Sequence, residues 1–151
     1  MSKLLIFLLF VLALNEKLDG ITVYDGAKLT KLMHEVATLN VNVGDEFYLR
    51  FSYTIRAQVS FLSHSWSFVN YNEIPAALEN FNKDGKAFKK GEDTKKGIFF
   101  HSSGYNYYKF KALKPSYNEI TLKFKYSSSG SCLGHNPSYI KNIKINILKK
   151  K

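Results

Sequence analysis

The residues that could carry out chemistry are few and widely spaced. The chain has four histidines, His34, His64, His101 and His135, and one cysteine, Cys132. No two histidines have the H-x-x-x-H spacing of a helical zinc site. Cys132 and His135 make only half of a zinc site, since no second pair of ligands has a matching spacing.

Nucleophilic catalysis is also disfavoured. A Cys132–His135 nucleophile would lie in a polar, glycine-rich stretch that has no oxyanion-binding motif. The chain contains no G-x-S-x-G elbow, phosphate-binding loop, dinucleotide fingerprint or calcium loop. The sequence therefore predicts a protein that is not an enzyme and that needs no metal and no cofactor.

The composition is that of one globular domain. Hydrophobic residues make up 45% of the 151 residues and charged residues 23%, enough for a core and unlike a disordered tail. The net charge of +10 fits either an acidic partner or simple solubility. We expect a monomer that does not bind nucleic acid.

The N-terminus has the features of a secretory signal peptide. Lys3 precedes an unbroken apolar run, Leu4–Leu14, which is too short to span a bilayer. We predict a signal peptide over residues 1–14, with cleavage after Ala13 or, alternatively, at Leu18-Asp19-Gly20, and a single domain over residues 21–151. This predicts secretion or residence in an endomembrane lumen, such as a lysosome- or phagosome-type vesicle, with no membrane span.

Alternating hydrophobicity predicts β-strands along most of the chain. In Glu119–Tyr126, for example, Ile120, Leu122 and Phe124 share one face and lysines occupy the other. Similar runs are Thr38–Val43, Glu46–Tyr53, Trp66–Val69, Tyr107–Ala112 and Ile143–Leu148. Short strands separated by turn signals predict an all-β fold, an immunoglobulin-like antiparallel β-sandwich of seven or eight strands.

The intervening segments lack this alternation. Thr54–Ser63 and Ser127–Pro137 are predicted to be loops, and Lys89–Gly97 an exposed, charged loop. Asn72–Asn80 is predicted to contain a helical turn after Pro75. The sequence Ser102-Ser103-Gly104 is expected to interrupt a strand.

The strand pattern resembles the chagasin family of papain-type cysteine protease inhibitors. The match is strongest at Ala37–Glu46 (ATLNVNVGDE), which is similar to the opening hairpin of that family. Trp66 takes the place of an aromatic residue that follows the first inhibitory loop. Tyr107–Ala112 and Glu119–Tyr126 resemble the paired late strands, and Ile143–Leu148 resembles the last strand.

The resemblance implies that three loops at one end of the sandwich form a wedge that enters a protease cleft. The family's Asn-Pro-Thr-Thr-Gly and Arg-Pro-Trp types of motif are absent, so the corresponding segments are identified by their place between strands. They comprise Gln58, Val59, Ser60, Phe61, Leu62, Ser63 and His64; Ser102, Ser103, Gly104 and Tyr105; and Ser127, Ser128, Ser129, Gly130 and Ser131.

The implied function is reversible, occlusive inhibition, with a papain-like cysteine protease as partner. The alternative is a secreted immunoglobulin-like binding module for a carbohydrate, a surface protein or a cargo. That alternative explains the absent motifs more directly, whereas pre-ordered loops on a rigid sandwich favour tight docking.

Overall fold

The computed structural model describes residues 16–32, 35–56, 63–95, 101–129 and 138–150. Strands account for most of the described residues, and these residues contain no α-helix. The predicted all-β class is therefore confirmed. In chain order the elements are β1 (Glu16–Leu18), β2 (Ile21–Asp25), the 3-10 turn η1 (Gly26–Lys28), β3 (Ala37–Asn42), β4 (Glu46–Arg56), β5 (Ser63–Phe68), β6 (Leu78–Asn80), β7 (Phe88–Lys95), β8 (His101–Ala112), β9 (Ile120–Ser129) and β10 (Ser138–Leu148).

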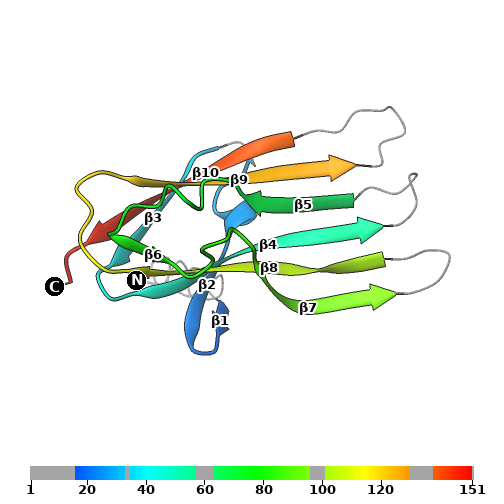
Figure 1. Ribbon diagram of the computed structural model, residues 1–151, viewed down its shortest axis with the longest axis horizontal. Helices are drawn as coiled ribbons and strands as arrows, with labels where there is room; N and C mark the ends of the chain where they lie inside the picture. Colours follow the sequence, from blue (N-terminus) through cyan, green and yellow to red (C-terminus); the bar gives the residue numbers. More distant parts are fainter. Residues whose placement is uncertain (1–15, 33–34, 57–62, 96–100, 130–137, 151) are drawn as a thin grey trace, which may run out of the picture.

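Hydrogen bonds join the ten strands of the described residues into one mixed sheet (Figure 1). The order is β1-β2-β4-β5-β9-β10-β3, and β8 pairs with the other side of β4 and carries β6 and β7. Two pairs, β2 with β4 and β3 with β10, are parallel, and the others are antiparallel. The sheet is thus mixed and has ten strands, where the sequence predicted an antiparallel fold of seven or eight.

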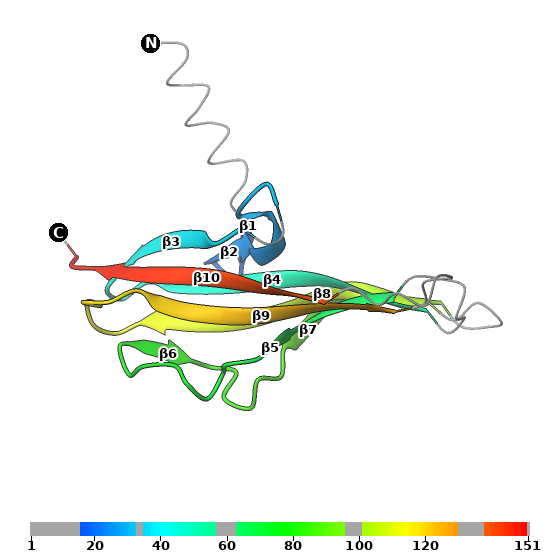
Figure 2. The ribbon, with the colours of Figure 1, turned by 90° about the horizontal axis from the view of Figure 1, so that it is seen from above.

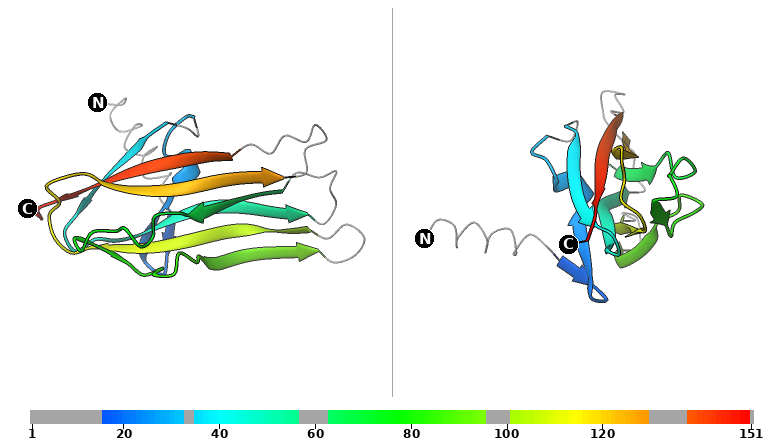
Figure 3. Two further views of the ribbon diagram at one scale, coloured as in Figure 1. Left: turned by 45° about the horizontal axis from the view of Figure 1, so that its top comes forward. Right: turned by 90° about the vertical axis from the view of Figure 1, so that its left-hand side faces the viewer.

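The link between β4 and β5 divides this sheet into two halves. It consists of one register pair, Thr54 with His64. On one side lie β5, β9, β10 and β3, and on the other lie β4, β8, β2 and their edge strands. Figure 2 places β3 and β6 on opposite sides of the molecule, and the end-on view in Figure 3 shows the curl of the sheet. The architecture is a curled sheet, which differs from the two separate sheets of the predicted sandwich.

An aromatic core fills the space between the two halves. Phe51 of β4 lies 4.4 Å from Phe124 of β9 and 5.0 Å from Trp66 of β5, measured between ring centroids. Phe124 also packs against Phe68 at 4.7 Å and Tyr108 at 5.1 Å. Gly26 closes the core beside Phe51, because a Cβ atom there would overlap the Phe51 ring.

The predicted domain begins at residue 21, but β1, which precedes it, already belongs to the sheet because it forms a hairpin with β2. Its turn is Asp19-Gly20, with φ of 53° and 78°. Such left-handed pairs suit the twist of a two-residue hairpin. Leu18 and Ile21 pack on a small second cluster formed by Val23 and neighbouring tyrosines. Residues 1–15 lie outside the described residues, so the signal peptide stays a prediction.

Several predicted loops are strands. β4 continues to Arg56, inside the predicted loop Thr54–Ser63, because its backbone pairs with β8 as far as His101. The predicted charged loop Lys89–Gly97 contains most of β7, an edge strand. Charged residues are common on edge strands because they discourage unwanted pairing, and they hide the period of two.

The predicted helical turn in Asn72–Asn80 is also wrong. The chain forms a turn in which the Leu78 amide donates to the Pro75 carbonyl at 3.1 Å, and Leu78–Asn80 then pairs with β8. Leu78 is buried in the core, so burial of its side chain overrides the local helical preference. No helix of the described residues is long and apolar enough to cross a membrane.

Phe124 and its neighbour Lys123 test the register of β9. Phe124 is fully buried and Lys123 is exposed on the other face. We expect Phe124→Ala to lower the free energy of unfolding by about 3–5 kcal/mol through loss of ring contacts and a residual cavity. Lys123→Ala is expected to change it by less than about 0.5 kcal/mol. Chemical denaturation of both variants measures the difference, and equal effects would contradict the register.

Candidate functional site

Strand ends from distant parts of the chain gather at one end of the sheet (Figure 1). We call this end the tip and define it by Thr54–Arg56, Ser63–Ser65, His101–Ser103 and Ser127–Ser129. It includes parts of all three segments that the sequence assigned to protease binding. β-ladders, rather than hydrophobic packing, bring them together.

One row of paired residues crosses five strands at the tip. His64 of β5 pairs with Ser128 of β9 on one side and Thr54 of β4 on the other. Thr54 in turn pairs with Ser103 of β8, which pairs with Asp93 of β7. The row therefore places one residue from each predicted binding segment, namely Ser128, His64 and Ser103, at the same level of the sheet.

The remaining candidates fall into two groups. Ser63, Ser102, Gly104, Tyr105, Ser127 and Ser129 are in strands and lie close to this row in the ladders. The candidates Gln58, Val59, Ser60, Phe61, Leu62, Gly130 and Ser131 lie outside the described residues.

The candidates in strands correct the loop assignment. Ser102–Tyr105 is continuous β8, paired with β4 on one side, and Ser127–Ser129 is the end of β9. The Ser102 side chain is buried, with 5% of its surface exposed, so it cannot contact a partner. The serines carry no hydrophobic alternation, although their backbones complete the ladders. For this reason the sequence pattern began β8 too late and ended β9 too early.

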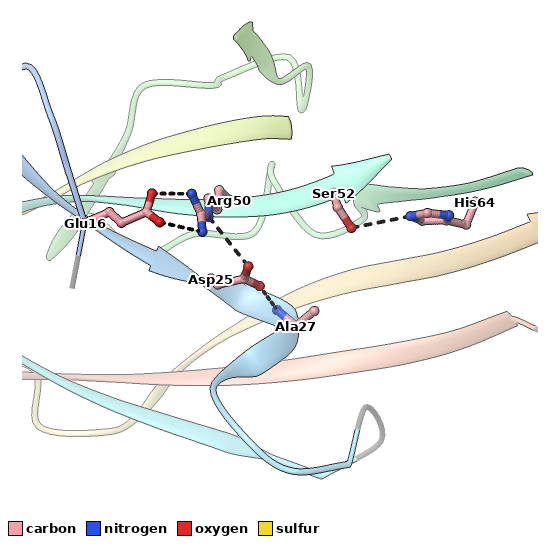
Figure 4. Close-up of polar contacts among 6 residues, drawn as sticks. All are labelled: Glu16, Asp25, Ala27, Arg50, Ser52 and His64. Carbon is pink, nitrogen blue, oxygen red and sulfur yellow. Dashed lines mark hydrogen bonds and ion pairs between the residues drawn. The ribbon is translucent and has the colours of Figure 1, made fainter. Parts of the chain in front are cut away.

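Tyr105 has a structural role that the sequence did not reveal. The Arg50 guanidinium lies 4.5 Å from the centre of the Tyr105 ring. Arg50 also forms a bidentate pair with Glu16 and lies 3.6 Å from the Asp25 carboxylate (Figure 4). Burial opposes the charge of Arg50, but the hydrogen bond and charge of Glu16 outweigh it and raise the pKa of the guanidinium. Tyr105 is thus packed beneath a clamp that ties β1 and β2 to β4.

His64 is the central titratable group of the tip. Its Nε2 lies 3.4 Å from the Ser52 hydroxyl (Figure 4), and its ring stacks on Tyr126 with centroids 6.1 Å apart. Partial burial lowers the pKa of His64, and the positive charge of Arg56 lowers it further. His64 is therefore held in its neutral form near neutral pH.

The Ser52–His64 pair does not form a catalytic triad with any described residue. A triad needs a carboxylate that orients the imidazole. The Asp25 carboxylate instead accepts a hydrogen bond from the Ala27 amide at 3.2 Å and pairs with Arg50. Among the described residues, no group of three or more potential metal ligands is found.

A shallow pocket of about 310 Å³ opens beside His64 at the tip. Its walls come from β4, β5 and β9, so it lies where the two halves of the sheet meet. It is lined by Thr54, Ile55, Arg56, Ser63, His64, Ser65, Ser127 and Ser128. Thr54, Ile55, Arg56 and Ser65 were not among the predicted site residues. These four residues lie between the alternating runs Glu46–Tyr53 and Trp66–Val69, so hydrophobic alternation did not identify them.

Comparisons with known proteins give distant structural neighbours only. No family model matches the sequence, and no curated protein matches it. The structure of PbICP-C in complex with falcipain-2 aligns with a TM-score of 0.37 and 12% identity, over 76% of this chain and 88% of that one. The solution structure of amebosin aligns with a TM-score of 0.29 and 10% identity, over 74% and 89%.

Replacing Tyr105 distinguishes a structural residue from a contact residue. We expect Tyr105→Ala to lower the free energy of unfolding by about 2 kcal/mol, because it removes a half-buried ring and the support of Arg50. Thermal and denaturant unfolding measure this loss. An unchanged free energy of unfolding would contradict this structural role and would make Tyr105 a candidate contact residue.

The lowered pKa of His64 predicts a pH-dependent stability. The unfolded chain, with a His64 pKa near 6.5, binds protons more readily than the folded chain. The stabilisation is therefore complete above that pH and is lost as the pH falls through the lower folded value. Denaturation midpoints from about pH 7.5 to about pH 5 should fall more steeply for the wild-type protein than for His64→Gln. Parallel curves would contradict the assignment.

Proposed function

We propose that this protein is a reversible inhibitor of papain-like cysteine proteases that uses the tip to occlude the active-site cleft. The observation that carries the proposal is the row Ser128–His64–Thr54–Ser103. It draws three segments that are distant in sequence into one narrow end. A narrow end that is built from several strands could enter the active-site cleft of a protease and block it.

The ladders also explain how such an end could resist cleavage. A protease cleaves a peptide that lies extended and accessible in its cleft. At the tip, the backbones of β4 and β8 are paired with each other as far as Arg56 and His101. Removing either strand for cleavage would require breaking these hydrogen bonds, and pre-ordered strands lose little entropy on binding.

The aromatic core provides the rigidity that this mode of binding needs. Trp66 and Tyr126 are directly paired and lie 5.1 Å apart, just below the row. In this proposal the two halves of the curled sheet act as the two layers of an immunoglobulin-like sandwich. The protein would act as a monomer, in the secretory route or an endomembrane lumen.

Titration of active papain and cathepsin L with the purified protein tests this function. Falcipain-2, a cysteine protease that is the partner in one of the neighbouring structures, is a third test enzyme. We expect reversible inhibition without cleavage of the inhibitor, measured by residual activity and mass spectrometry.

A pair of arginine substitutions locates the binding surface. Ser128→Arg places a long side chain in the row and should raise the inhibition constant at least about tenfold, equivalent to about 1.4 kcal/mol. Ser67→Arg introduces the same group on the exposed face of β5, away from the tip, and should change it less than about twofold. Folded protein that leaves all three proteases active at micromolar concentration would contradict the function and favour a non-inhibitory binding module.

A further inference from the structure

The tip pocket has an unusual chemical lining. Five of its eight residues carry hydroxyl groups, namely Thr54, Ser63, Ser65, Ser127 and Ser128, and the others are Ile55, Arg56 and His64. None of the described residues that line it carries a carboxylate. By contrast, the pocket of about 380 Å³ beneath β6 contains both Glu79 and Lys83. The tip pocket therefore combines hydroxyl donors with positive charge.

Part of the lining is held in place and part remains available. The Ser63 hydroxyl accepts a hydrogen bond from the Arg56 amide at 2.8 Å, which fixes the two strand ends to each other. The side chains of Ser65, Ser127 and Ser128 form no hydrogen bond with the described part of the chain. These three hydroxyls come from neighbouring strands, with Ser65 directly paired to Ser127.

We propose that this pocket binds an anionic oxygen group, either a carboxylate or a sulfate. Hydroxyl groups donate hydrogen bonds to such oxygens, and a guanidinium is a strong charge-assisted donor to them. The volume of about 310 Å³ is at the lower end of the range for small-ligand sites. Anion binding at this site requires no protease, so its test is independent of the test of inhibition.

Binding of an anion is linked to the protonation of His64. Among the described residues, Arg56 of β4 is the charged group that acts on His64, while Ser52 of β4 and Tyr126 of β9 contact its ring. An anion in the pocket would offset the effect of Arg56 and favour the imidazolium. By reciprocity the anion must bind more tightly as the pH falls through the pKa of His64.

Two-dimensional NMR of the purified protein, titrated with sodium sulfate against sodium chloride of equal ionic strength, tests the proposal. We expect saturable shifts of the Ser65, Ser127 and Ser128 amides and a higher titration midpoint for the His64 ring. Affinity should be greater at about pH 5 than at about pH 7.5. A parallel titration with sodium acetate compares carboxylate with sulfate, and saturable binding of either anion supports the site.

Three variants make the test specific. Arg56→Gln should weaken sulfate binding at least about tenfold, and in His64→Gln the affinity should no longer rise as the pH falls. Lys125→Gln removes the same charge from the exposed face of β9 and should leave binding unchanged. Shifts that do not saturate, or equal loss in Lys125→Gln and Arg56→Gln, would overturn the proposal. Spectra of each variant without anion establish that it is folded.

Discussion

The contact between Phe51 and Phe124 is the interaction on which the rest of the structure depends. The two halves of the sheet share one register pair between β4 and β5. Backbone hydrogen bonds therefore cannot fix how the halves lie relative to each other. The rings of Phe51 and Phe124, 4.4 Å apart and both fully buried, supply that constraint. Burying such rings stabilises a fold by roughly 2–3 kcal/mol each, far more than one strand pair.

The same arrangement explains why the tip exists. Near the core, Phe51 of β4 and Trp66 of β5 pack against each other with ring centroids 5.0 Å apart, although the two strands belong to different halves. Beyond these rings, at Thr54 and His64, the two strands pair directly. This short pairing joins the ladders of the two halves, and it thereby brings three distant segments into one row.

The parts of the fold that sequence could predict are those with one buried face. Glu46–Tyr53 and Glu119–Tyr126 were identified by their alternation, and Phe51 and Phe124 are buried as expected. β7 and the ends of β8 and β9 were missed because their stability comes from pairing, which leaves no mark in hydrophobic spacing. Pairing partners that are distant in sequence, such as His64 and Ser128, cannot be read from one sequence without an alignment.

Lys141 shows a different limit of sequence prediction. It stands in phase with Ile143 and the later isoleucines of β10, and it is fully buried. Its ammonium group donates to the Thr30 hydroxyl and to the Leu32 carbonyl, and burial lowers the pKa of Lys141. In the sequence alone, a lysine at this position suggests an exposed strand end. Its burial depends on hydrogen-bond partners that lie more than a hundred residues earlier in the chain.

The distribution of acidic residues connects the fold with the chemistry of the tip. Among the described residues, Arg50 forms ion pairs with Glu16 and Asp25, and Lys90 forms one with Asp19. Two further ion pairs join Glu46 to Lys109 and Glu119 to Lys144. The carboxylates on Arg50 and Lys90 tie the N-terminal hairpin to the sheet, and the other two join β4 to β8 and the residue before β9 to β10. None of them lines the tip pocket, where Arg56 and His64 lie among hydroxyl groups. Arg56 is the charged residue among the described lining of this pocket, and its guanidinium would attract an acidic group on a partner that approaches this end.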